Sequence, residues 1–186
     1  MAAALAAGIA AALLYPLPPD APAPGSDPNS PLVVAFDGDA VLFDSASEAI
    51  YQRDGLQAFC RHEQENAAVP LGRGPFAGVL QGLAALQAAA APGETLVRTC
   101  LITARGAPAH ARLFTTFAAW GLQVDQMFLM GGAPKAAVLA AIRPHLFFDD
   151  SLAHVGPASR IVPTGHVAIG ACGDLDDRPS ADAVAA

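Results

Sequence analysis

The stretch Leu32-Val-Val-Ala-Phe-Asp-Gly-Asp39 decides the fold. Five apolar, β-prone residues are followed at once by two carboxylates that flank a glycine. A short, continuous apolar run is typical of a strand that is buried on both faces, as strands of a parallel sheet are. We therefore expect a buried strand at 32–36 that delivers Asp37 and Asp39 to one edge of a sheet.

The chain downstream alternates between strand and helix patterns. Further strands are predicted at 99–102, 126–130 and 145–148, with a fifth at 159–162. Apolar residues at helical spacing predict the helices between them, which contain Val79, Leu80, Leu83 and Leu86; Leu113, Phe117 and Trp120 after a first-turn Pro108; and Val138, Leu139 and Ile142. This alternation predicts an α/β fold with a parallel sheet and right-handed crossovers. Ligands of such sheets bind beyond the carboxyl ends of the strands.

Polar side chains follow four of these strands in order. They are Asp37 and Asp39, Thr103, Lys135, and the pair Asp149 and Asp150. The Asp-Gly-Asp segment alone could equally be a turn or a calcium loop, but four such sets favour one shared site. Carboxylates gathered at one sheet edge would repel one another unless a cation joined them. Mg²⁺ suits such oxygen ligands and also takes a substrate phosphate oxygen.

This set of side chains is suited to phosphoryl transfer. One carboxylate can attack phosphorus and form an acyl phosphate. A second carboxylate, two residues further on, can protonate the leaving oxygen and then activate water. A hydroxyl and an ammonium group can hold the remaining phosphoryl oxygens.

Longer segments around these residues carry a family resemblance. They are Val34–Phe43, Leu101–Arg105 with Ala107–His110, Trp120-Gly121, Gly131–Lys135 and Arg143–Asp150. Together they resemble the C-terminal catalytic half of the cytosolic 5′-nucleotidase I family, within the haloacid dehalogenase superfamily. The resemblance extends from about Ala7 to Val167, and it implies a Rossmannoid parallel sheet with a small helical cap insertion.

The resemblance also implies a role for each polar residue. Asp37 would be the nucleophile and a metal ligand, and Asp39 would be the general acid and base, with its backbone carbonyl on the metal. Thr103 and Lys135 would bind phosphate. The Asp149-Asp150 pair would supply the remaining metal carboxylate, and which of the two binds directly stays open.

The expected function is therefore Mg²⁺-dependent hydrolysis of nucleoside 5′-monophosphates to nucleoside and phosphate through an aspartyl-phosphate. One alternative is a phosphatase or phosphotransferase for another small phosphate ester, because this fold hosts many substrates. A second alternative is a non-catalytic remnant domain. The net charge of -7 argues against a nucleic-acid partner. Three widely spaced cysteines, Cys60, Cys100 and Cys172, match no zinc or disulfide pattern and favour a cytoplasmic protein.

The resemblance divides the chain into three parts. Residues 1–31 would be an apolar helix and a proline-rich linker, the remnant of an N-terminal half that longer family members carry. Residues 32–173 would form the catalytic domain, with a cap insertion at about 44–75 that opens with a capping box at 45–48. The last residues, 174–186, are expected to be a flexible tail.

The apolar run Met1–Leu14 needs a buried environment. It lacks the basic region of a signal peptide and is shorter than a membrane span, so we expect a helix rather than a secretory or membrane segment. A helix that is apolar on all sides is buried on all sides. It could dock on its own domain or pair with a second copy, and we expect the homo-oligomer because the core has no evident vacancy.

Other polar residues are expected to be structural. The histidines lack ligand spacing and are predicted at surfaces or helix caps; they are His62, His110, His145, His154 and His166. Arg105 could approach a phosphate or form an ion pair at the start of the next helix. Trp120 is expected in the core, and His62–Glu65 on the solvated face of a cap helix.

Overall fold

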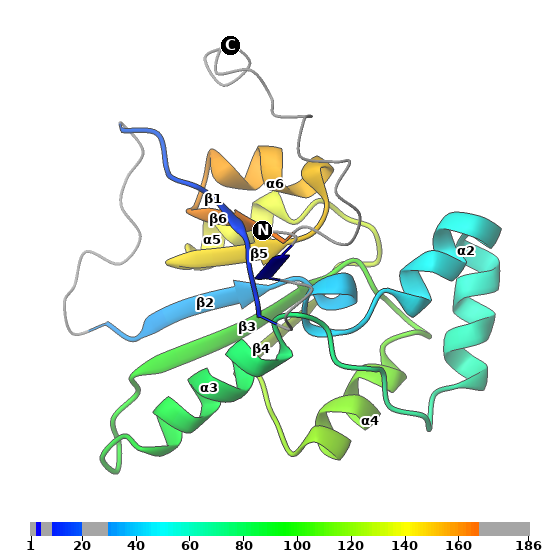
Figure 1. Ribbon diagram of the computed structural model, residues 1–186, viewed down its shortest axis with the longest axis horizontal. Coiled ribbons are helices and arrows are strands. Elements are labelled where there is room, and N and C mark those ends of the chain that lie inside the picture. The colour runs from blue at the N-terminus through cyan, green and yellow to red at the C-terminus, as the bar shows by residue number, and fades with distance from the viewer. Residues whose placement is uncertain (1–2, 5–8, 20–29, 168–186) are drawn as a thin grey trace.

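The computed structural model describes residues 3–4, 9–19 and 30–167 (Figure 1). Its centre is a six-stranded sheet with the order β1-β6-β5-β2-β3-β4. All pairs are parallel except the edge pair of β1 and β6. The predicted α/β fold is confirmed, and the predicted parallel sheet is confirmed apart from that antiparallel edge pair. Among the described residues, no helix has both the length and the apolar character to cross a membrane.

The elements follow one another along the chain as the alternation predicts. The strands are β1 Leu13–Tyr15, β2 Leu32–Phe36, β3 Val97–Thr103, β4 Gln126–Leu129, β5 Leu146–Asp149 and β6 Thr164–His166. The helices are the π-type turn η1 Gly38–Leu42, α2 Ala46–Glu65, α3 Ala77–Ala88, α4 Ala111–Trp120, α5 Ala136–Ile142 and α6 Leu152–Ser159. In Figure 1, α5 and α6 lie above the sheet, α3 and α4 lie below it, and α2 projects to the right.

The central strand β2 packs on both of its faces. Val34 and Phe36 belong to a core cluster that includes Leu80 of α3 and Leu113 of α4. Ala35, between them, belongs to the opposite cluster, which includes Leu139 of α5 and Ala158 of α6. Successive side chains of a strand point to opposite faces, so one apolar run fills two cores. Burial of apolar side chains is the main favourable term in the free energy of folding.

The strand order reverses at β2. From β2 the chain builds β3 and β4 on one side, then returns to place β5 and β6 on the other. Phe36, the last residue of β2, is in register with Leu101 of β3 and with Phe148 of β5. A reversal of this kind leaves a crevice at the carboxyl ends of the strands, where ligands of open α/β sheets bind.

Two local predictions from the sequence are wrong. The fifth strand is not at 159–162 but at Thr164–His166, because Ile161 and Val162 donate their amides to the Ala158 carbonyl and extend the turn after α6. Pro108 lies in a turn, and α4 begins only at Ala111.

The capping box at the start of α2 is also absent. Ser45 makes no side-chain capping hydrogen bond. Instead, Asp44 accepts a hydrogen bond from the Ala46 amide at 3.1 Å. The Asp44 carboxylate thereby satisfies one of the amides at the start of the helix that have no partner within the helix.

The N-terminal apolar run ends as a strand rather than a helix. Leu13–Tyr15 pairs antiparallel with β6, with Leu14 opposite Gly165. Ala10 and Ala12 pack against the core cluster of β2. The end of this run, from Ala10 onward, therefore docks on its own domain, and the prediction of a helix as far as Leu14 is wrong. Self-association stays a prediction, and residues 20–29 of the linker and the tail at 174–186 lie outside the described residues.

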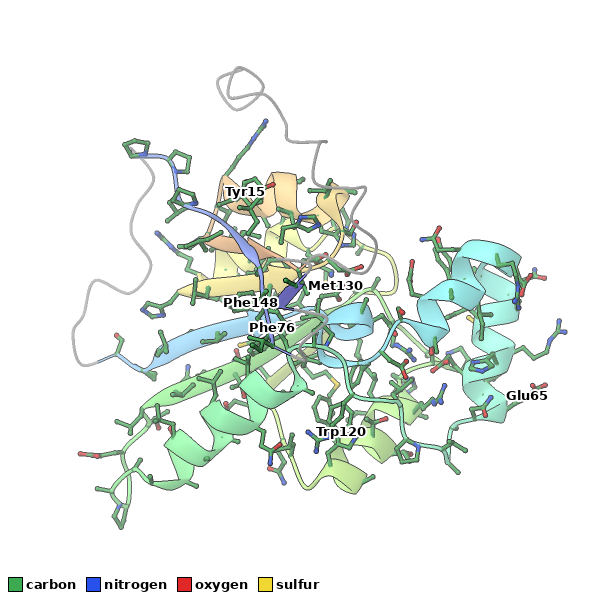
Figure 2. All side chains as sticks on the ribbon, viewed as in Figure 1. Tyr15, Glu65, Phe76, Trp120, Met130 and Phe148 are labelled. Carbon is green, nitrogen blue, oxygen red and sulfur yellow. The ribbon has the colours of Figure 1, made fainter. Side chains whose placement is uncertain are left out.

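The contact between β1 and β6 depends on a missing side chain at Gly165. A Cβ there would lie 2.6 Å from Phe148 Cδ1 and 3.3 Å from Ala12 Cβ. Phe148 cannot move away easily, because its ring packs on Phe76 at 4.6 Å and on Phe36 at 5.7 Å between centroids. Figure 2 shows Phe76 and Phe148 together at the centre of the molecule.

We predict that Gly165→Ala lowers the free energy of unfolding by about 1–3 kcal/mol, because overpacking forces the neighbours apart. The matched control is Gly156→Ala in α6, where a Cβ meets open space and the better helix former is expected to add up to about 1 kcal/mol. Chemical denaturation measures both. Equal stability of the two variants would contradict the packing described for β6.

Candidate active site

Three charged side chains meet where β2 and β5 end. Lys135, which directly precedes α5, places its Nζ 2.8 Å from Asp37 Oδ1 and 2.6 Å from Asp149 Oδ2. All three residues are buried. They come from separate stretches of chain, and only the parallel strand order brings them together. We call Asp37, Lys135 and Asp149 the triad.

The backbone around Asp37 fixes the direction of the chain at this point. The Asp37 amide donates to the Phe148 carbonyl at 2.8 Å, which ties the end of β2 to β5. A Cβ at residue 38 would lie 3.0 Å from Thr103 Oγ1, so Gly38 allows the Thr103 hydroxyl to lie beside the turn. Ala40 has a φ of 62°, in the left-handed region, and turns the chain away from the sheet.

The predicted site residues surround one cavity. Its volume is about 520 Å³, and five of the six predicted residues line it: Asp37, Asp39, Thr103, Lys135 and Asp150. The sixth, Asp149, is fully buried and contacts Lys135. The structure thus brings all six to one edge of the sheet, as the sequence predicts. It separates their side chains into two groups, however, because Asp39 faces Arg105 and not the triad.

Burial and like charge govern the protonation of these carboxyls. Burial, with a smaller contribution from Asp149, raises the pKa of Asp37 well above its ordinary value although Lys135 opposes this. Burial also raises the pKa of Asp149, but hydrogen bonds and charge from His154 and Lys135 outweigh it and hold that pKa below its ordinary value. Burial and the Asp149 charge raise the pKa of Asp150 to about 6.

Lys135 responds in the opposite sense. Burial alone would lower its pKa, but the charges of Asp37 and Asp149 raise the pKa above its ordinary value. One ammonium group therefore forms ion pairs with two buried carboxylates, and the carboxyl of Asp150 lies nearby. Such an excess of negative charge is what a bound cation relieves, since an opposite charge favours the ionised form of each carboxyl.

Asp37, Asp149 and His154 could hold this cation. One ligand atom from each lies within 4.8 Å of the other two. His154 Nδ1 lies 3.3 Å from Asp149 Oδ1, so the prediction that places His154 among the surface and cap histidines misses its proximity to the triad. A signal exists in hindsight, because His154 lies in the first turn of the helix that follows Asp149.

The opposite wall of the cavity comes from α2. Its contribution mixes apolar and polar side chains: Glu48, Tyr51, Gln52, Leu56, Phe59 and Cys60. Tyr51 is 44% exposed and stands edge-on to Phe59, with 6.2 Å between ring centroids. Gln52 donates to Glu48 at 2.6 Å. This wall offers an aromatic ring and hydrogen-bonding groups to a ligand held at the triad.

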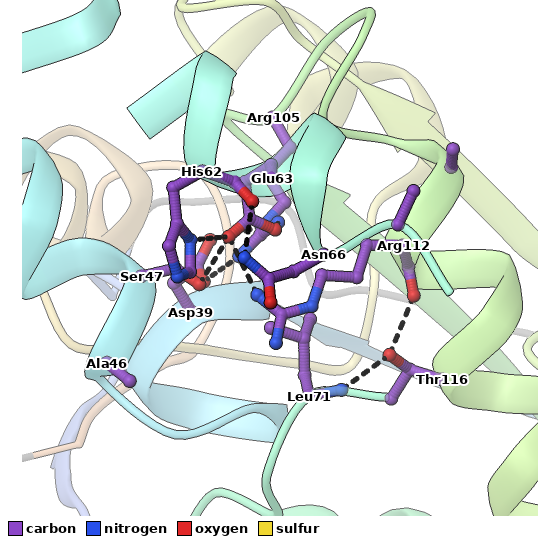
Figure 3. Close-up of polar contacts among 12 residues, drawn as sticks. Asp39, Ala46, Ser47, His62, Glu63, Asn66, Leu71, Arg105, Arg112 and Thr116 are labelled. Carbon is purple, nitrogen blue, oxygen red and sulfur yellow. Dashed lines mark hydrogen bonds and ion pairs between the residues drawn. The ribbon is translucent and has the colours of Figure 1, made fainter. Parts of the chain in front are cut away.

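A second charged cluster lies behind Asp39. Glu63 of α2 is 1% exposed and accepts hydrogen bonds from Arg105, from Arg112 at 2.9 Å and from Ser47 at 2.8 Å (Figure 3). The prediction of a solvated face at His62–Glu65 is therefore wrong for Glu63. Its signal was the spacing to Phe59, four residues earlier on the same buried helix face.

Packing bears on three further expectations from the sequence. Of the two alternatives for Arg105, the ion pair is present: its guanidinium binds Asp39 and Glu63. Trp120 packs against Phe43, with 5.6 Å between centroids, as predicted for a core residue. Cys100 is buried in the core.

Comparison with known proteins identifies the family of this chain. A family model described as 5′-nucleotidase matches residues 1–173. The chain belongs to the 5′-nucleotidase family. It is also 42% identical, over 138 residues, to human Cytosolic 5′-nucleotidase 1B. That match covers 72% of this chain and 23% of the human protein, so the chain spans about a quarter of the length of this relative. No solved structure matches this chain.

In this 5′-nucleotidase family member, Glu63 is predicted to be essential for stability. Removing one partner from a buried ion-pair network leaves a charge uncompensated and costs about 3–5 kcal/mol. We expect Glu63→Gln to lower the free energy of unfolding by that amount. Glu65→Gln, two residues further along α2 and exposed, is the control and should change it by less than about 0.5 kcal/mol. Urea denaturation that finds the two variants equally stable would contradict the burial of Glu63.

Proposed function

We propose that this chain hydrolyses nucleoside 5′-monophosphates to nucleoside and inorganic phosphate, with Mg²⁺ and through an aspartyl-phosphate on Asp37. Membership of the 5′-nucleotidase family supports the reaction class. The observation that carries the proposal is the triad at the strand-order reversal, facing a cavity whose other wall is α2. A cavity of about 520 Å³ is in the range of small-molecule sites.

The chemistry assigned to each residue follows from its place. The Asp37 carboxylate attacks phosphorus, and the bond from phosphorus to the nucleoside 5′-oxygen breaks as Asp39 gives that oxygen a proton. Asp39 then takes a proton from the water that attacks the acyl phosphate, which releases phosphate and restores Asp37. Thr103 and Lys135 hold the phosphoryl oxygens, and Lys135 also favours the ionised Asp37 that the attack requires.

The donor set fits Mg²⁺. Asp37 and Asp149 would hold the ion through carboxylate oxygens, with the Asp39 backbone carbonyl as a further oxygen ligand. Contact with both His154 and Lys135 favours Asp149 over Asp150 as the direct ligand. When bound, Mg²⁺ supplies positive charge that offsets the charge of the phosphoryl oxygens and of the buried carboxylates.

The helix α2 is the proposed nucleoside-binding element. It makes up most of the segment 44–75, which we propose as the cap. The half-exposed ring of Tyr51 offers a surface for a base, and the Gln52 and Glu48 side chains offer hydrogen bonds to base or sugar. A cytoplasmic location is proposed from the name of the human relative alone.

Phosphate release from a set of nucleoside monophosphates, with Mg²⁺ or with a chelator, tests the proposal. We expect Asp37→Asn to reduce turnover to background, because the amide cannot attack phosphorus. Asp39→Asn should lower the rate by about 10²–10⁴-fold, the usual cost of losing a general acid or base. The chelator should abolish the reaction of the unaltered chain.

The matched control is Asp54→Asn, an exposed position on α2 that pairs with Arg53. It should keep the activity of the unaltered chain. Full activity of Asp37→Asn would exclude covalent catalysis at this residue. An unaltered chain that releases no phosphate from any nucleoside monophosphate with Mg²⁺ would overturn the proposed function itself.

A further inference from the structure

We infer that Glu63 of α2 is a positioning residue which, through Arg105, sets the direction of the Asp39 carboxylate for proton transfer. The inference rests on the proposed function of Asp39 as general acid and base. It assigns the reaction a dependence on two residues that no part of the proposed chemistry uses, and it ties the helix over the cavity to the proton-transfer step.

The first link is the contact between Arg105 and Asp39. Arg105 Nε donates to Asp39 Oδ2 at 2.7 Å, and its Nη2 donates to Oδ1 at 2.6 Å. Two parallel hydrogen bonds from a rigid, planar guanidinium hold a carboxylate in one plane. Each oxygen keeps a lone pair outside this contact. Because Asp39 lines the cavity, the plane set by Arg105 decides which way those lone pairs face.

The second link holds Arg105 itself. Its side chain is 1% exposed, and its remaining terminal nitrogen, Nη1, donates to Glu63 Oε2. The guanidinium carbon lies 5.1 Å from the centre of the Phe59 ring, one turn earlier on α2. Glu63 and Phe59, two residues of one helix, therefore both contact the guanidinium that binds Asp39.

The third link fixes Glu63. Its Oε1 accepts from Arg112 Nη1 at 2.9 Å and from Ser47 Oγ at 2.8 Å (Figure 3). Asp39, Glu63, Arg105 and Arg112 thus form a group of two anions and two cations with no net charge. Of these four residues, Asp39 and Arg105 line the cavity, and Glu63 and Arg112 are buried behind them.

A purely structural role explains this group poorly. Buried ion pairs are often no more stabilising than apolar side chains of the same size. Hydrogen bonds between charged groups also fix the orientation of the side chains. This series of contacts ends at Asp39, which lines the cavity. The hydrogen bond from Ser47 to Glu63 also spans the kink at Gly55, where φ is 80°, so it joins the two halves of α2. The helix that forms the nucleoside wall is thereby coupled to Asp39.

The test compares two substrates that differ in their need for an acid. A nucleoside 5′-oxygen leaves as a poor leaving group and requires a proton, whereas the phenolate of p-nitrophenyl phosphate leaves without one. The ratio kcat/KM reports only the steps up to leaving-group departure, so slow hydrolysis of the acyl phosphate does not obscure the comparison. Two variants are compared. Arg105→Lys keeps the positive charge but cannot make the paired hydrogen bonds to Asp39, and Glu63→Asp shortens the side chain that contacts Arg105.

We expect both variants to lower kcat/KM for nucleoside monophosphates by about 10–10²-fold, below the full loss of a general acid, and to leave kcat/KM for p-nitrophenyl phosphate near that of the unaltered chain. Ser47→Ala, which removes one hydrogen bond to Glu63 and no charge, should show the same selective loss at smaller size. In an Asp39→Asn background, Arg105→Lys should add no further selective loss, since residues that act as one unit are not additive.

The matched control is Arg53→Lys, an exposed arginine on the same helix, which should leave both substrates unaffected. Equal losses for both substrates in Arg105→Lys and Ser47→Ala, with melting curves that show folded protein, would overturn the inference and leave the proposed function intact. An unaltered chain that hydrolyses neither substrate would instead overturn the proposed function.

Discussion

The buried contact of Lys135 with Asp37 and Asp149 is the constraint on which the rest of this structure depends. Two carboxylates and one ammonium group can share a buried point only if three distant stretches of chain end there. The parallel order of β2 and β5 provides two of these ends, and the turn before α5 provides the third. The apolar cores on both faces of β2 supply the stability that offsets the cost of burying these charges.

The segment Asp37-Gly38-Asp39 separates two carboxylates into different electrostatic surroundings. Asp37 faces Lys135 and the candidate cation site, whereas Asp39 faces Arg105 and the neutral group behind it. Enzymes commonly give two nearby carboxyls different roles by giving them different environments. Here the two carboxylates are separated in the sequence by one residue, Gly38. A side chain at this position would crowd Thr103.

The sequence predicts this site well because strand ends in a parallel sheet lie together whatever the intervening chain does. Six polar residues could therefore be placed at one edge from the strand pattern alone. Glu63 was not placed there, because its partners Arg105 and Arg112 lie more than forty residues away and the spacing to Phe59 alone does not indicate a buried charge. The two shortest strands were missed for a related reason: Leu13–Tyr15 and Thr164–His166 are three residues each and acquire their conformation from pairing.

A covalent phosphate on Asp37 is the central claim, and trapping it is the most direct measurement. The chain would be mixed with a nucleoside monophosphate labelled in its phosphate, quenched in acid within milliseconds to seconds, and digested for mass spectrometry. The account predicts a phosphoryl group on the peptide that carries Asp37 in the unaltered chain, and none on that peptide in Asp37→Asn. Phosphate release with no covalent phosphate at any time, or with the group on another residue, would contradict it.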